Sequence, residues 1–92
     1  MVIVRNAAAG TMESSDAMVT VSPGKEGIRI ELGSTVYVQF GRQIENLVRQ
    51  VAEEAGVENA DIKVQDFGAL DCTIRARVET ALERASKEET AS

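Results

Sequence analysis

The first half of the chain contains two stretches with apolar residues at every second position. Apolar side chains occupy every second position in residues 17–21 and again in residues 28–32. A period of two places them on one face of a β-strand. Residues 23–27 between the stretches are rich in turn-forming glycine and proline. The pattern therefore predicts a β-hairpin over residues 17–34, with one apolar face to be covered.

Apolar residues then recur every three or four positions in two longer stretches, a spacing typical of amphipathic helices. The first helix is expected over residues 36–55, and Gly56 directly after it suits a C-cap. The second is expected over residues 70–86, with Asp71 in its first turn, where a carboxylate is favourable. The two apolar stripes comprise Phe40, Ile44, Leu47, Val48, Val51 and Ala55, and Leu70, Ile74, Val78, Ala81, Leu82 and Ala85.

Two shorter segments complete the predicted fold. Residues 61–65 read as a short strand whose Ile62 and Val64 face inwards, and residues 7–16 as a short strand ending in a Ser-Ser-Asp turn. The order β-β-β-α-β-α predicts an α+β domain. We expect a small, mostly antiparallel sheet, a β-hairpin plus one or two further strands, covered on one face by two amphipathic helices.

Composition agrees with one folded domain. The chain has 92 residues, of which 43% are hydrophobic and 27% charged, as in ordinary globular proteins. We therefore expect a single domain over residues 1–92, with fraying at residues 1–6 and 87–92, which lie outside the patterned segments.

Charge and missing residue types exclude several function classes. The net charge of −5 and only three aromatic residues argue against nucleic-acid binding. The chain lacks histidine, the commonest general base and metal ligand, and one cysteine forms no disulfide framework. No apolar run reaches the ~20 residues of a membrane span, and the N-terminal residues do not resemble a signal peptide. We expect a cytoplasmic location, no membrane contact and no metal site.

Catalytic candidates are weak. Carboxylates are paired at Asp66 and Asp71 and at Glu13 and Asp16, a pattern more typical of caps and turns than of acid–base catalysis. Cys72 lies early in the second predicted helix, where a thiol can be reactive. A small, half-buried helix residue is the favoured interpretation.

Serine hydroxyls and arginine side chains are candidates for modification and for binding a partner. Ser14 and Ser15, flanked by Glu13 and Asp16, read as turn residues that a modifying enzyme could also reach. A solvated, salt-bridged helix face is predicted where arginines are intermixed with glutamates, at Arg75, Arg77, Glu79, Glu83 and Arg84. Docking to an acidic partner is the alternative.

Two motifs resemble the acyl carrier proteins of citrate lyase, the gamma subunits of that enzyme. They are AGTMESSDAM at residues 9–18 and DFGALDCTIRARVE at residues 66–79. In that family the serine of the first motif carries phosphoribosyl-dephospho-CoA, joined to its hydroxyl by a phosphodiester. Matching motif to motif, the resemblance implies covalent attachment at Ser14. The family usually has glycine at the next position, where this chain has Ser15, the less favoured candidate.

The resemblance also implies a function. The chain would be a non-catalytic subunit whose prosthetic thiol bears acetyl and citryl thioesters while citrate is cleaved to acetate and oxaloacetate. Its implied partners are the alpha subunit, which exchanges acyl groups, the beta subunit, which cleaves the citryl thioester, and a prosthetic-group transferase. The alternatives are the carrier subunit of a related enzyme such as malonate decarboxylase, and an unmodified small interaction domain.

Overall fold

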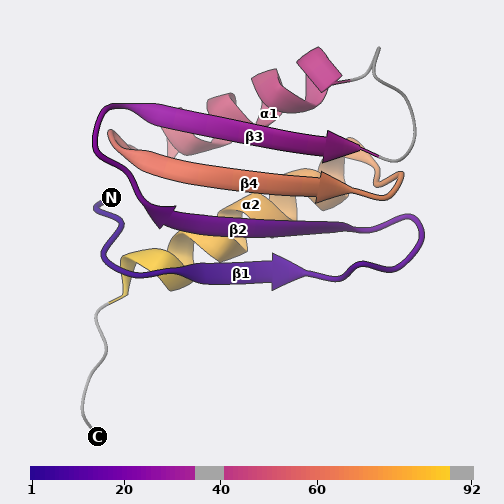
Figure 1. The fold of residues 1–92 in the computed structure, drawn as a ribbon, viewed down its shortest axis with the longest axis horizontal. Helices are drawn as coiled ribbons and strands as arrows, with labels where there is room; N and C mark the ends of the chain where they lie inside the picture. The colour runs from indigo at the N-terminus through magenta and orange to yellow at the C-terminus, as the bar shows by residue number, and fades with distance from the viewer. Residues whose placement is uncertain (35–40, 88–92) are drawn as a thin grey trace, which may run out of the picture.

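The computed structural model describes residues 1–34 and 41–87, which form a four-stranded sheet with two helices on one face (Figure 1). The order β-β-β-α-β-α and the α+β class are both as predicted. The elements are β1 (Ala7–Gly10), β2 (Ala17–Pro23), β3 (Ile28–Ser34), α1 (Gly41–Glu54), β4 (Ala60–Asp66) and α2 (Asp71–Ser86).

The pairing of the strands differs from the predicted hairpin. The strand order is β1-β2-β4-β3, so β4 lies between the two strands expected to pair with each other. β2 runs antiparallel to β4, with Ala17 opposite Asp66, whereas β3 runs parallel to β4, with Ile28 opposite Ala60. The predicted hairpin over residues 17–34 is therefore wrong. A parallel pair needs a crossover connection, and the chain between β3 and β4 contains α1, which supplies it.

The core lies between the sheet and the two helices. The alternation in β2 and β4 places one set of side chains under the helices, and the helical stripes meet them there, as the sequence predicts. The largest fully buried side chains are Ile62, Ile74, Leu82, Val19, Val21, Val48, Val64 and Val78. The opposite face of the sheet is open, and both helices lie behind it in Figure 1.

The C-terminal end of α1 has the predicted glycine cap. Gly56 has a φ of 76°, a left-handed conformation that glycine adopts readily. Its N–H donates to the carbonyl of Glu53 at 3.0 Å, and the N–H of Val57 donates to the carbonyl of Ala52 at 3.0 Å. These two bonds form a Schellman motif. The predicted start of this helix, including Phe40, lies outside the described residues.

The start of α2 corrects two predictions. Leu70, expected on the packed stripe, has an extended backbone and is 71% exposed, because the helix begins only at Asp71. Cys72, expected to be half-buried, is exposed. It precedes the buried Ile74 by two positions, about 200° around the helix, and so faces away from the sheet.

The N-terminal segment, where we expect fraying, makes several contacts. Ile3 is buried, and the N–H groups of Val4 and Arg5 donate to the carbonyl of Ala85 at 2.9 and 3.2 Å. These contacts argue against fraying of residues 1–6. Fraying in solution stays a prediction. Within residues 1–34 and 41–87, no helix is long and apolar enough to cross a membrane.

Candidate functional site

The two candidate serines lie in the β1–β2 loop, residues 11–16, at the end of the sheet where β4 ends and α2 begins (Figure 1). The N–H of Asp16 donates to the carbonyl of Glu13 at 3.2 Å, which closes a turn with Ser14 and Ser15 at its centre. Both serines are exposed, and neither hydroxyl has a hydrogen-bond partner within the described ranges. Both hydroxyls are therefore open to a modifying enzyme.

The backbone of Ser15 distinguishes it from Ser14. Its φ is 66°, and it is the one non-glycine residue with a positive φ that the described ranges contain. The second central residue of a type II turn requires such a φ, which is why glycine is favoured there. This conformation suits the glycine that the family resemblance implies at this position. Ser14 stays the candidate attachment residue.

The turn is fastened to the loop that follows β4. The N–H of Ser15 donates to the carbonyl of Phe67 at 2.8 Å, and the N–H of Phe67 donates to the carbonyl of Asp16 at 2.9 Å. These bonds extend the antiparallel β2–β4 ladder past its last pair, Ala17 and Asp66. The hydroxyl of Ser14 therefore sits on a tip whose base is held by sheet-like hydrogen bonds.

Asp16 is the centre of the polar network beneath the turn. Arg77 of α2 donates to it twice, from Nε to Oδ1 and from Nη2 to Oδ2, each at 3.0 Å. The Thr11 hydroxyl donates to Oδ2, and the N–H of Ala17 donates to Oδ1 at 2.7 Å. The hydrogen bonds from Arg77, Thr11 and Ala17 hold the pKa of the Asp16 carboxyl well below its usual range. The carboxylate stays ionised and links the Ser14 loop to α2.

Gly10 allows this loop to close. Its φ is 105°, and a Cβ atom added there would lie 1.8 Å from the carbonyl oxygen of Ala17 and 3.2 Å from Cδ of Arg77. Sequence reasoning singled out neither Gly10 nor the pairing of Asp16 with Arg77. Gly10, Asp16 and Arg77 all lie in the two motifs that carry the family resemblance. Those motifs are the feature of the sequence that could have pointed to them.

The other candidate carboxylates serve local structure. Asp66 is buried, and its Oδ1 accepts hydrogen bonds from the N–H groups of Gly68 and Ala69 at 3.1 and 2.9 Å. Asp71 is exposed in the first turn of α2, as predicted. In the part of the chain that the structure describes, no three His, Cys, Asp or Glu side chains are grouped so as to hold a metal ion.

The remaining α2 arginines bind within the molecule. Arg75 contacts Glu54 at 3.2 Å and Glu79 at 3.7 Å, which confirms the predicted salt bridges on the helix face for this arginine. Hydrogen bonds from Gln50 and Arg75 lower the pKa of Glu54. Arg84 donates from Nη1 to the carbonyl of Ala8 at 2.8 Å, and Ala8 belongs to the edge strand β1.

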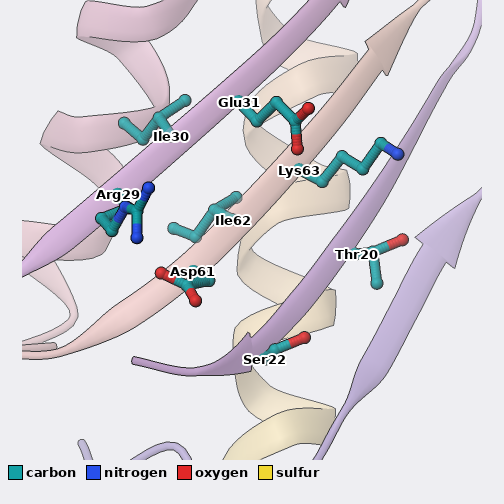
Figure 2. A pocket seen from close by; sticks show the side chains of 8 residues that line it. All are labelled: Thr20, Ser22, Arg29, Ile30, Glu31, Asp61, Ile62 and Lys63. Carbon is teal, nitrogen blue, oxygen red and sulfur yellow. The ribbon is translucent and has the colours of Figure 1, made fainter. Parts of the chain in front are cut away.

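A polar hollow on the open face of the sheet is a separate feature (Figure 2). In the β3–β4 register, Arg29 lies beside Asp61 and Glu31 beside Lys63, so opposite charges neighbour one another along the hollow. Ser14 does not line it. The candidate attachment site is therefore the turn at the end of the sheet and not this hollow.

Comparisons with known proteins place the chain among acyl carriers. The family model described as "Malonate decarboxylase delta subunit (MdcD)", an acyl carrier protein model, matches residues 4–85. A citrate lyase acyl carrier protein from Halothermothrix orenii is 56% identical over 95% of this chain and 93% of its own length. One from Lactococcus lactis is 51% identical over 92% of this chain and 88% of its own length.

A solved structure shares the fold. A chain in the crystal structure of a Pseudomonas malonate decarboxylase hetero-tetramer in complex with malonate superimposes with a TM-score of 0.73 at 22% identity. The match covers 91% of this chain and 87% of that one. At this level of identity, the comparison shows that the two chains have the same architecture.

Proposed function

Because this chain belongs to the family of the citrate lyase acyl carrier proteins, we propose that it carries phosphoribosyl-dephospho-CoA on Ser14 and serves the cleavage of citrate to acetate and oxaloacetate. The carrier role itself, without catalysis by the chain, follows from the family. The observation that carries the proposal beyond the family is the exposed Ser14 hydroxyl at the tip of a braced turn.

The residues around Ser14 fit a large covalent group. A phosphodiester on the hydroxyl needs space and solvent on the outer side, and Ser14 with both its chain neighbours is exposed. No internal hydrogen bond is lost on modification, because the Ser14 hydroxyl has no partner within the described ranges. The bonds that hold the turn are made by Ser15, Asp16 and Thr11, so the fold does not depend on the modified atom.

The chain then acts by holding and presenting the group. When bound, the group supplies a thiol at the end of a long flexible arm, on which acyl groups are held as thioesters. The turn fixes one end of that arm, through Phe67 and Arg77, to the sheet and to α2. Tethering in this way replaces a bimolecular encounter with a high effective concentration at the partner active sites. We expect those partners to be the alpha and beta subunits of citrate lyase, after a transferase has attached the group.

Service in a related enzyme is the second candidate. The matching family model is named for a malonate decarboxylase subunit, and the solved neighbour comes from such an enzyme. The two candidates share the attachment site and differ in the acyl group and in the partner subunits. Identification of the subunits that co-purify with the chain from its host distinguishes them.

The proposal is tested by matched serine variants. Ser14→Ala should receive no prosthetic group and leave the citrate lyase complex inactive, while its thermal unfolding stays unchanged. Ser15→Ala is the control, and it should be modified and active. Normal lyase activity with Ser14→Ala would contradict the assignment of the site. Loss of activity with Ser15→Ala alone would move the attachment site to Ser15.

A further inference from the structure

Two large apolar side chains are exposed in the segments that surround Ser14. Met12, in the β1–β2 loop, is 61% exposed, and Leu70, just before α2, is 71% exposed. The two segments lie at the same end of the sheet (Figure 1), and the Ser15–Phe67 and Phe67–Asp16 hydrogen bonds join them. Isolated exposed apolar residues are common, and Met1, Val2 and Val4 of the N-terminal segment are exposed as well. Met12 and Leu70 differ from these in lying in the two segments beside the candidate attachment site.

The segments at this end of the sheet carry acidic and no basic side chains. Neither residues 11–16 nor residues 67–73 contain a lysine or an arginine. Glu13 and Asp71 are exposed and make no ion pair within the described ranges. The charge of Arg77, which reaches the base of the loop, is matched by Asp16. A partner that fits this end therefore offers an apolar hollow with basic groups at its rim.

We propose that this end, with Met12 and Leu70 as apolar anchors and Glu13 and Asp71 as an acidic rim, is the docking surface for the transferase that attaches the prosthetic group. This inference rests on the proposed function and adds the residues of this chain that the transferase contacts. The transferase must bring its active site to the Ser14 hydroxyl itself, so its surface must cover the neighbouring side chains. The active sites of the lyase subunits instead receive the far end of the arm.

The chemistry of the transferase agrees with the charge of this end. The group that it transfers carries phosphates, and phosphate recognition uses arginine and lysine side chains. An active site lined by such cations attracts the acidic rim around Ser14. The hydrogen bonds between the two loops hold their backbones in place before docking, which reduces the conformational entropy lost on binding.

Binding and modification are measured separately. In calorimetry with the purified transferase, the wild-type apo chain gives the reference affinity. The double variant Met12→Ser, Leu70→Ser should bind at least about tenfold more weakly, because apolar anchors at the centre of an interface carry much of its affinity. The control is Val2→Ser, which removes an apolar side chain that is 74% exposed, in the N-terminal segment at the opposite end of the sheet (Figure 1).

The modification reaction gives the second measurement. The donor is phosphoribosyl-dephospho-CoA activated as a polyphosphate: the Ser14 oxygen forms a bond to the phosphate of the group, the phosphoanhydride bond breaks, and the remaining phosphates and the hydroxyl proton leave. With this donor present, the double variant should show a KM for the carrier at least about tenfold higher and a nearly unchanged kcat, as expected for lost docking. Glu13→Gln with Asp71→Asn should weaken binding less at high salt than at low salt, because screening reduces the contribution of charges. A double apolar variant with affinity and KM within about twofold of the wild type would overturn the inference.

Different results would refute the proposed function and the docking surface. If the wild-type chain binds the transferase and gains no mass on incubation with the donor, the attachment itself is refuted, and this docking role is refuted with it. If modification proceeds normally in the double apolar variant, attachment stands and the docking surface is wrong.

Discussion

At the residue scale, Asp16 connects the parts of the molecule that position Ser14. Its carboxylate accepts hydrogen bonds from Arg77 of α2, from Thr11 of the same loop and from the first N–H of β2. Such charge-assisted, bidentate pairing is stronger and more directional than an ordinary surface ion pair. The orientation of the Ser14 turn relative to α2 therefore depends on the ionised state of one side chain.

We expect Asp16→Asn to lower stability in a pH-dependent way. The pKa of Asp16 is lower in the folded state than in the unfolded state. Its contribution is therefore complete above the unfolded aspartate value of about 3.9 and is lost as the pH falls toward the folded value. Urea unfolding should show wild type and variant well separated at pH 7 and converging below about pH 4. A separation that does not change with pH would contradict this role.

Gly10→Ala should destabilise the fold by at least about 2 kcal/mol, because the added Cβ would collide with the carbonyl of Ala17 in a left-handed backbone. Gly27→Ala is the matched control. Gly27 also has a positive φ, of 69°, but nothing lies within 4 Å of its added Cβ. Only backbone strain of about 1 kcal/mol is then expected. Equal losses in the two variants, measured by chemical denaturation, would show that the collision at Gly10 is relieved.

Ser15→Gly should raise the free energy of unfolding by about 0.5–1 kcal/mol, because glycine adopts a φ of 66° without the steric cost that serine meets. Ser15→Val should lower it. The same denaturation experiment tests both variants. A glycine variant that is less stable than the wild type would argue against the left-handed turn.

At the element scale, local patterns predict the strands and helices well and predict their partners poorly. The alternation in residues 17–21 and 28–32 correctly indicates two strands, and the turn residues between them correctly indicate a reversal. Nothing in that segment says that β4, some 30 residues further on, lies between the two strands. Pairing is decided by the whole sheet, since β4 provides an apolar partner for both strands under the helices.

The candidate site shows the same division. Ser14 could be proposed from its motif. Asp16 and Arg77, however, are 61 positions apart, and their contact arises only from the packing of α2 near β1 and β2. Leu70 is the clearest error of the helical pattern. Its spacing from Ile74 fits a stripe, yet the helix starts one residue later and leaves it exposed.

This boundary gives a prediction for α2. Ile74→Ala should cost about 2–5 kcal/mol, because the fully buried side chain fills the space between helix and sheet. Leu70→Ala should cost less than about 0.5 kcal/mol, although both residues belong to the same sequence pattern. Urea denaturation of the two variants measures the contrast. A large loss for Leu70→Ala would place that side chain in the core.

At the scale of the whole molecule, the stable core and the candidate attachment site lie in different parts of the fold. The sheet and helices form an apolar core, and the Ser14 turn stands at one end of the sheet (Figure 1). A carrier needs an anchor and a stable body, because the chemistry occurs at partner active sites reached by a tethered arm. The net charge of −5 favours partners with basic surfaces.

The most direct test of the central claim is the mass of the chain isolated from its host, followed by peptide mapping. The account predicts the bare chain plus one phosphoribosyl-dephospho-CoA, located on the peptide that contains Ser14 and assigned to that hydroxyl by fragmentation. A bare chain isolated from cells that are actively cleaving citrate would contradict the account.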